Sequence, residues 1–302
     1  MKKIFKWVGI VLGILVGLIV VLVVTLLIVG NSYLNRTYTI PVEKINLPTD
    51  AASLAKGKRL VNAICGSCHG PDLSGVTGWM SAGPIGTVDS ANLTAGAGGI
   101  GAEYTSTEDY VRAIRHGVDP DGKATYMPAV TALSNLGDDD LGAIIAYLKT
   151  IPPIAHTTNG QNFGPLGKIM IGAGMFGKFP VDEVDHNAHP VAPPAAVNVE
   201  YGQYLVNIIG CRSCHGEKLA GGPYPDPSVK VLAPNLTPGG ELAAWTEQDF
   251  IATLRSGKAP SGHTLNNKYM PWKGIGGLTD DELKAIWLYL SSLPKLPTQT
   301  TK

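Results

Sequence analysis

The sequence Cys65-Gly66-Ser67-Cys68-His69 recurs, with one residue changed, as Cys211-Arg212-Ser213-Cys214-His215. Two cysteines separated by two residues and followed at once by histidine form the pattern at which haem is attached covalently. In that chemistry both thiols become thioethers of the haem, and the imidazole becomes the proximal iron ligand. These four are the only cysteines of the chain, so none is left for a disulfide. The pattern therefore predicts two covalently bound haem c groups.

Zinc is the alternative ligand for these cysteines. Four cysteines in two Cys-x-x-Cys pairs can close a tetrahedral zinc site. Zinc binding leaves unexplained why His69 and His215 each directly follow the second cysteine. We therefore favour haem over zinc at both motifs.

The segments around the two motifs repeat each other in order and in approximate spacing. The matched pairs are Gly57–Ile64 with Gly202–Ile209, Asn92-Leu93-Thr94 with Asn235-Leu236-Thr237, Glu108–Arg115 with Gln248–Arg255, Tyr126-Met127-Pro128 with Tyr269-Met270-Pro271, and Leu141–Leu148 with Leu283–Leu290. The repeat predicts two copies of one haem-binding domain, residues 50–152 and 199–295, joined by a linker over 153–198.

The repeat also selects the second iron ligand. Of six methionines, only Met127 and Met270 occupy matching positions, 58 and 55 residues after the motif histidines. A thioether opposite an imidazole keeps iron six-coordinate and raises its potential. A methionine in such a turn can instead fill a gap in the core, but recurrence in both copies favours ligation. His116 and His263 lack equivalents in the other copy, and we interpret them as surface or loop histidines.

The first 36 residues read as a membrane anchor. Val8 to Val29 form a run of 22 uncharged residues, long enough to cross a bilayer core of about 30 Å. Lys2, Lys3 and Lys6 precede this run, which predicts that the N-terminus is cytoplasmic and that the haem domains lie on the periplasmic side. A cleaved signal peptide is the alternative, but its apolar region is usually shorter and ends in an Ala-x-Ala-like site. We favour an uncleaved, single-pass anchor.

Charge and helix patterns complete the prediction of fold class. The formal net charge is zero and no basic run resembles a nucleic-acid-binding segment. Three helices are expected in each copy, over residues 52–64, 107–116 and 138–150 and over 199–209, 246–256 and 280–292. The Gly- and Pro-rich stretches 74–101 and 216–240 make poor helices or strands. The sequence therefore predicts an all-α fold whose thin core depends on haem.

Two further patterns allow more than one interpretation. The segment 160–180 is too interrupted to span a membrane, and we expect it to pack against a domain or to lie near the membrane surface. Acidic residues and histidines within 182–189 could bind a metal, but a solvated linker face is the favoured interpretation: Asp182, Glu183, Asp185, His186 and His189. The two Asn-Leu-Thr triplets are formal glycosylation acceptors. Their recurrence favours a turn role near the haem instead.

With these motifs, the chain resembles the class I-type c cytochromes in a tandem di-haem form. More narrowly, it is similar to membrane-bound cytochrome c subunits of alcohol or gluconate dehydrogenases, which typically carry three haem domains where this chain has two. The resemblance implies an electron-transfer protein rather than an enzyme. The expected donor is a dehydrogenase or a quinol-oxidising complex, and the expected acceptor is a terminal oxidase or soluble carrier. The alternatives are a peroxidase-like or thiosulfate-oxidising di-haem enzyme and a fixed subunit of a larger complex.

Overall fold

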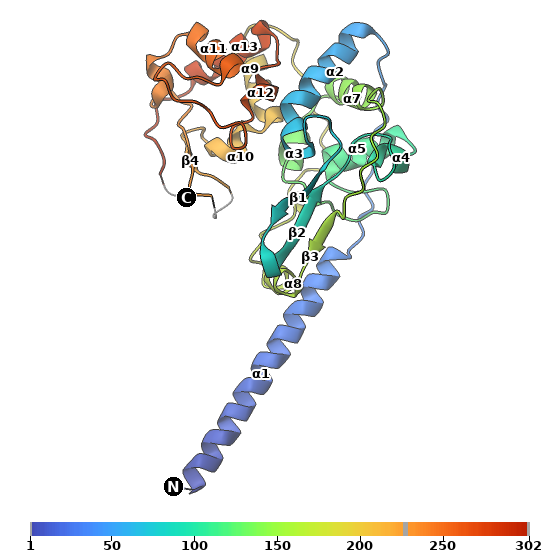
Figure 1. The fold of residues 1–302 in the computed structure, drawn as a ribbon, viewed down its shortest axis with the longest axis vertical. Helices are drawn as coiled ribbons and strands as arrows, with labels where there is room; N and C mark the ends of the chain where they lie inside the picture. The colour runs from blue at the N-terminus through green and yellow to red at the C-terminus, as the bar shows by residue number, and fades with distance from the viewer. Residues whose placement is uncertain (1, 226–228, 301–302) are drawn as a thin grey trace.

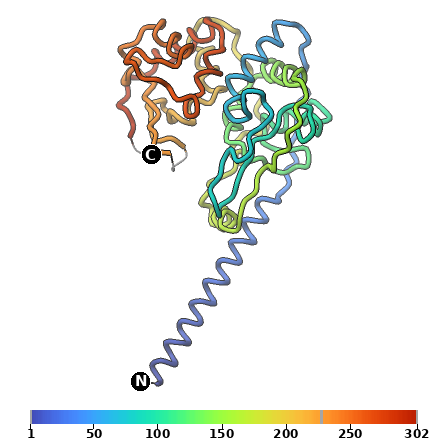
Figure 2. The backbone as a smooth tube through the Cα atoms, viewed as in Figure 1, coloured from blue at the N-terminus to red at the C-terminus, as the bar shows by residue number. Residues whose placement is uncertain are grey.

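The computed structural model describes residues 2–225 and 229–300. Helix α1 (Lys2–Leu34) projects away from the remainder of the chain, as Figures 1 and 2 show. Among the described residues, α1 is the helix that is long and apolar enough to cross a membrane. Its side chains from Ile4 to Val29 are largely exposed, because few other elements cover it. This exposed apolar surface fits a membrane anchor.

The first half of the chain is built around two crossed helices. Helix α2 (Ala51–Ile64) packs on α7 (Asp138–Leu148), and a β-carbon at Gly57 would overlap the carbonyl oxygen of Ala143. Glycine at this position therefore lets the two helices approach closely. The other helices of this half are α3 (Gly66–His69), α4 (Ile100–Glu103), α5 (Thr107–His116) and α6 (Val130–Leu133).

The second half repeats this arrangement. Helix α9 (Val199–Ile209) crosses α13 (Asp280–Ser292), and a β-carbon at Gly202 would overlap the carbonyl oxygen of Ala285. Between them lie α10 (Cys211–His215), η3 (Glu241–Ala244), α11 (Glu247–Ser256) and α12 (Trp272–Ile275). Capping boxes start α5, α11 and α13, each pairing a Ser or Thr N-cap with an acid three residues later. The expected helices are therefore present in both halves.

The fold is mostly helical rather than all-α. Strands β1 (Val76–Ser81), β2 (Gly86–Ser90) and β3 (Gln161–Phe163) form an antiparallel sheet, with η1 (Gly83–Ile85) at the hairpin tip. A smaller pair, β4 (Gly222–Pro223) and β5 (Leu232–Ala233), lies in the second half. The Gly-rich stretches thus form strands, contrary to expectation. Gly83 and Gly86 have φ values of 54° and 140°, a region that other residues seldom adopt and that permits this tight hairpin.

The segment between the halves is folded onto the first half, as expected for residues 160–180. Strand β3 extends the sheet, and α8 (Pro165–Gly172) lies along the last turns of α1. Phe179 and Val181, on either side of the start of η2 (Pro180–Asp182), are buried in a second apolar cluster with Phe163. The aromatic rings of Tyr33 and Phe179 meet edge-on at 5.0 Å.

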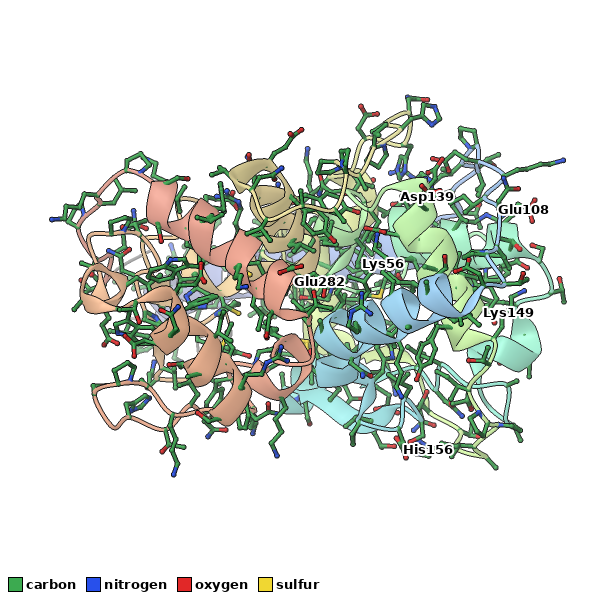
Figure 3. All side chains as sticks on the ribbon, turned by 90° about the horizontal axis from the view of Figure 1, so that it is seen from above. Lys56, Glu108, Asp139, Lys149, His156 and Glu282 are labelled. Atoms are coloured by element: carbon green, nitrogen blue, oxygen red, sulfur yellow. The ribbon has the colours of Figure 1, made fainter. Side chains whose placement is uncertain are left out.

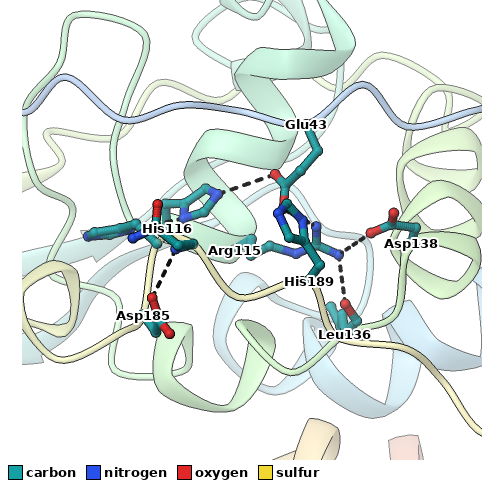
Figure 4. A network of polar contacts seen from close by, with 9 residues as sticks. Glu43, Arg115, His116, Leu136, Asp138, Asp185 and His189 are labelled. Carbon is teal, nitrogen blue, oxygen red and sulfur yellow. Dashed lines mark hydrogen bonds and ion pairs between the residues drawn. The ribbon is translucent and has the colours of Figure 1, made fainter.

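The prediction that His116 lies at the surface or in a loop is wrong. His116 ends α5 and is 1% exposed, because the connecting segment covers it. Figure 4 shows it beside Glu43 and Arg115, and its Nδ1 lies 3.0 Å from Nδ1 of His186. His263 is exposed, as expected.

The acidic and histidine residues at 182–189 do not gather into a metal site. Within residues 2–225 and 229–300, no group of three or more His, Cys, Asp or Glu side chains is placed to hold a metal ion. The favoured alternative, a solvated face, is also only partly correct. Asp182 is half-buried and accepts a hydrogen bond of 2.5 Å from the Tyr33 hydroxyl, while His186 Nε2 donates to Val181 O at 2.8 Å.

Candidate haem sites

Both Cys-x-x-Cys-His motifs lie on a tight helical turn that follows a long helix. Cys65 is the C-cap of α2, and α3 begins at the next residue; the His69 amide donates to the Cys65 carbonyl at 2.9 Å. In the second half, Gly210 separates α9 from α10 in a left-handed conformation. Each motif is therefore presented from the end of a helix that is anchored in the core.

The two motif histidines make the same hydrogen bond. His69 Nδ1 lies 2.7 Å from the Ala91 carbonyl oxygen, and His215 Nδ1 lies 2.8 Å from the Pro234 carbonyl oxygen. Because a carbonyl can only accept, Nδ1 carries the proton and Nε2 keeps its lone pair. Burial lowers the pKa of both imidazoles, which keeps them neutral. A metal-ligating histidine is usually oriented in this way, through a hydrogen bond from its other nitrogen.

The four motif cysteines are half-buried and form no disulfide with one another. Burial raises the pKa of Cys65 and of Cys211 to about 12, and it also raises the pKa of Cys68 and Cys214. A zinc site needs its ligands gathered around one point, and within residues 2–225 and 229–300 no group of three or more His, Cys, Asp or Glu side chains is placed to hold a metal ion. Thioether formation leaves uncharged sulfur, which suits a buried position. The residues present therefore fit covalently attached haem c better than zinc.

Met127 and Met270 occupy equivalent places in the two halves. Each is half-buried against the main apolar core, as are Cys65 and Cys211. Each is followed by proline and then by a short helix, α6 or α12. By contrast, Met80 lies on β1, and Met175 is 69% exposed. The ligand role of Met127 and Met270 stays a prediction at this stage.

The two Asn-Leu-Thr triplets form matching buried turns, which confirms the turn role. Asn92 Oδ1 accepts from the amide of Thr94 at 2.9 Å, and Asn235 Oδ1 accepts from the amide of Thr237 at 2.8 Å. Both amide nitrogens donate to the chain that follows the last helix of their half, Asn92 to Ile154 O and Asn235 to Leu296 O, at 2.8 Å each. Asn92 and Asn235 are 0% and 3% exposed, so neither can accept a glycan in the folded protein.

Sequence reasoning missed a pair of leucines beside the motifs. Leu73 and Leu219, each four residues after the motif histidine, have φ values of 62° and 57°. Left-handed backbone is uncommon for a branched residue, and it costs on the order of 1–3 kcal/mol. Their carbonyls accept from Leu93 and Leu236 at 2.8 Å, which closes the same loop in both halves. The equal spacing within the repeat was the signal that could have identified them.

A pseudo-twofold interface joins the two halves. Arg59 on α2 pairs with Glu282 on α13 through two hydrogen bonds of 3.2 Å. Tyr204 on α9 donates to Asp140 on α7 at 2.7 Å. In the repeat, Arg59 aligns with Tyr204, and Asp140 aligns with Glu282. The same pair of repeat positions is therefore in contact twice, once with the first position supplied by the first half and once with it supplied by the second half. Figure 3 shows Lys56 and Glu282 between the halves, where Lys56 also pairs with Asp140.

The packing at this interface follows the same symmetry. Helix α12 packs on α2, where a β-carbon at Gly274 would overlap the Asn62 carbonyl, and α6 packs on α9. Buried apolar residues of both halves form one continuous cluster. Figure 1 shows α3 and α10 on facing sides of the two halves. Burial raises the pKa of Cys214, and an ionised Cys68 would raise it further, which requires the two side chains, and so the two motifs, to lie near each other.

A predominantly helical fold, two Cys-x-x-Cys-His turns and two oriented imidazoles define a c-type cytochrome. Comparison with known proteins agrees, because residues 52–148 and 197–290 match the family described as cytochrome c oxidase, cbb3-type, subunit III. The chain belongs to this cytochrome c family, and membership implies covalently bound haem c. The resemblance drawn from the sequence is thereby confirmed.

Several curated relatives are cytochrome subunits of dehydrogenases. The chain is 30% identical over 283 residues to the alcohol dehydrogenase (quinone) cytochrome c subunit of Gluconacetobacter polyoxogenes, covering 82% of this chain and 57% of that protein. It is 29% identical to the fructose dehydrogenase cytochrome subunit of Gluconobacter japonicus, covering 84% and 55%. It is also 29% identical to the gluconate 2-dehydrogenase cytochrome c subunit of Pantoea cypripedii, covering 80% and 60%. The chain thus spans little more than half the length of these relatives.

Proposed function

We propose that this chain is a membrane-anchored di-haem c-type cytochrome that transfers electrons from a respiratory donor to a terminal acceptor. Its two haem domains are residues 50–152 and 199–295. The observation that carries the proposal is the pair of equivalent imidazoles, His69 and His215, each oriented by a backbone carbonyl and each following two half-buried cysteines.

In each half, two cysteines, one histidine and one methionine have separate roles in holding one haem. Cys65 and Cys68, and in the second half Cys211 and Cys214, form the thioethers. His69 and His215 would hold the iron through Nε2, and Met127 and Met270 would hold it through sulfur. When bound, haem c supplies an iron that stores one electron at a time. With a histidine and a methionine in each half to hold the iron, the site would leave no place for a substrate on it, and this favours electron transfer over a peroxidase-like or thiosulfate-oxidising enzyme.

Electrons cross between the halves at the interface around Cys68 and Cys214. The proximity of these two thiols supports a relay in which one site receives the electron and the other delivers it. The continuous core and the paired contacts at Arg59 and Tyr204 hold the two sites in one arrangement. A fixed arrangement suits electron transfer, because the protein then needs no reorganisation at each passage.

The partners are proposed by analogy with the relatives. Three of them are named as cytochrome subunits of alcohol, fructose and gluconate dehydrogenases, which supports a dehydrogenase as donor and a fixed cytochrome subunit as one mode of action. Helix α1 then anchors the chain in the cytoplasmic membrane. The lysines at positions 2, 3 and 6 favour a cytoplasmic N-terminus, with the haem domains on the periplasmic side.

Spectroscopy of the purified holoprotein tests this function. Met127→Leu and Met270→Leu should each remove about half of the sulfur-to-ferric-iron absorption band and lower the potential of one haem, because leucine cannot ligate iron. Each variant should also let the reduced protein bind carbon monoxide at one haem. Met80→Leu, on β1, is the matched control and should change none of these readouts. If the wild-type protein lacks the band or binds carbon monoxide, the proposed function as a di-haem electron carrier is wrong.

A further inference from the structure

Helix α8 is fastened to the end of α1 that leaves the membrane. A β-carbon at Gly30 would overlap the Lys168 carbonyl, and one at Gly172 would overlap the Leu26 carbonyl. The two backbones are therefore in direct contact, and α8 lies at the level of Leu26 to Gly30 of α1. Glycines on both helices make this approach possible.

The length of α1 determines how deep in the membrane its contact with α8 lies. The uncharged run from Val8 to Val29 measures about 33 Å at 1.5 Å per residue, against a bilayer core of about 30 Å. Leu26 lies three residues before the end of the run, or about 4.5 Å along the helix axis. When α1 spans the bilayer, Leu26 and the helix packed on it are therefore at the boundary between acyl chains and headgroups.

The residues that α8 and its neighbours leave exposed are suited to this boundary. From Phe163 to Gly177 the only charged residue is Lys168, and the hairpin tip from Trp79 to Val88 has none. Leu166 is 41% exposed, Met175 is 69% exposed and Met80 on β1 is 37% exposed. Helix α8 also packs on η1, where a β-carbon at Gly167 would overlap the Ile85 carbonyl, so the hairpin tip adjoins it. Figure 1 shows the tip and α8 beside the same end of α1.

A hollow beside this surface carries the polar groups expected at headgroup level. Its volume is about 430 Å³, and Tyr33, Arg36, Lys178 and Asp182 are among its lining residues. Arg36 pairs with Asp182 at 3.6 Å and stacks over the ring of Tyr38 at 4.7 Å. Aromatic and basic side chains at the end of a spanning helix are typical of the membrane interface.

We infer that α8, the segment to Gly177 and the tip of the β1–β2 hairpin form a second membrane contact, immersed in the outer interface of the bilayer. This inference rests on the proposed membrane span of α1. We assign this surface to the lipid interface rather than to a protein, because α8 packs directly on the spanning helix and shares its depth. The contact holds the first half of the chain in one orientation to the membrane and prevents it from swivelling about α1.

Depth-dependent fluorescence quenching tests the inference on the full-length holoprotein. The native cysteines are consumed by haem, so Leu166→Cys, Met175→Cys and Met80→Cys each offer one thiol for a fluorophore. Ile19→Cys provides the reference inside the bilayer. Val191→Cys and Leu232→Cys, at positions 87% and 57% exposed, provide the references in water. Each labelled variant is reconstituted in vesicles without nitroxide, with lipids that carry a nitroxide on the acyl chain near the glycerol, and with lipids that carry it near the methyl end of the chain.

The expected result is a loss of fluorescence at positions 166, 175 and 80 with the nitroxide near the glycerol, a loss at Ile19 with the nitroxide near the methyl end, and no loss at Val191 or Leu232 with either. Quenching at Ile19 without quenching at 166 and 175 would overturn the inference while leaving the membrane anchor intact. Protection of these positions from a water-soluble thiol reagent, without quenching by lipid, would assign the surface to a protein partner or a second copy and would also overturn it. Failure of Ile19 to be quenched would reject the anchor and the inference together.

Discussion

The Tyr204 hydroxyl donates a hydrogen bond of 2.7 Å to the Asp140 carboxylate, although the two residues belong to different halves of the chain. Asp140 is fully buried and also pairs with Lys56. The equivalent positions, Arg59 and Glu282, meet in the opposite direction. Two copies of one sequence pattern therefore recognise each other through the same helix face, which joins the two candidate haem sites into one unit.

Removing the Tyr204 hydroxyl should weaken the interface between the two halves. Tyr204→Phe leaves Oδ2 of the buried Asp140 carboxylate without its donor, while Lys56 still pairs with Oδ1, and we expect a loss of about 1–3 kcal/mol in the free energy of unfolding. Urea unfolding followed by haem absorbance measures the loss. Tyr201→Phe on the same helix is the control, because the Tyr201 hydroxyl makes no side-chain hydrogen bond among the described residues. Equal effects of the two substitutions would contradict a specific role for the Tyr204–Asp140 contact.

The crossing of α2 and α7 should tolerate no side chain at Gly57. Gly57→Ala places a β-carbon against the Ala143 carbonyl, and overpacking of this kind costs about 1–3 kcal/mol. Gly202→Ala should behave alike in the second half. Gly66→Ala serves as the control, because a β-carbon there meets nothing within 4 Å. Thermal unfolding of the holoprotein compares the three variants, and an unchanged midpoint for Gly57→Ala would refute the close crossing.

Loss of one haem should unfold the half that held it. Cys65→Ser combined with Cys68→Ser prevents attachment in the first half and removes the apolar surface that haem would add to its thin core. We expect that half to lose its cooperative thermal transition in circular dichroism, while the second half keeps its haem. The variant with Cys211→Ser and Cys214→Ser should show the reverse. A native-like cooperative transition of the haem-free half would disprove this dependence.

Acid should destabilise the protein through His116. Burial lowers the pKa of this imidazole below its ordinary value of 6.5, although Glu43 opposes the shift and the neighbouring His186 and Arg115 add to it. Below pH 6.5 the unfolded chain therefore binds more protons at this residue than the folded chain. The free energy of unfolding falls as the pH drops from 6.5 towards the folded-state pKa.

The His116→Gln variant isolates this effect. Its unfolding free energy should vary less with pH between about 6.5 and 5 than that of the wild type, because the titrating group is gone. Glu43 acts in a separate window. Its pKa is lowered, since the hydrogen bond to its own backbone and the Arg115 guanidinium outweigh burial, so its contribution is lost only below 4.5. Denaturant titrations at a series of pH values compare the two proteins. If the free energy of unfolding varies with pH equally in both, His116 is not the group responsible.

Local chemistry explains which parts were predictable. The motif cysteines and histidines and the capping residues act through short spacings, and the repeat doubles each signal. The strands escaped prediction because β2 pairs with β3 across a gap of 70 residues or more, through backbone groups that no side-chain pattern marks. His116 was misassigned because its burial depends on a connecting segment that approaches from residue 186.

The sequence by itself determined the cofactor chemistry, the two equivalent halves and the apolar N-terminal helix, because these depend on residue type and spacing along the chain. Only the tertiary structure decided how the halves meet, that Arg59 and Tyr204 occupy one position of a pseudo-twofold interface, and that α8 lies at the end of α1. Those arrangements depend on which surfaces complement each other in space. Backbone contacts at glycines such as Gly30 and Gly172 decide that complementarity, and it becomes visible only when distant segments are brought together.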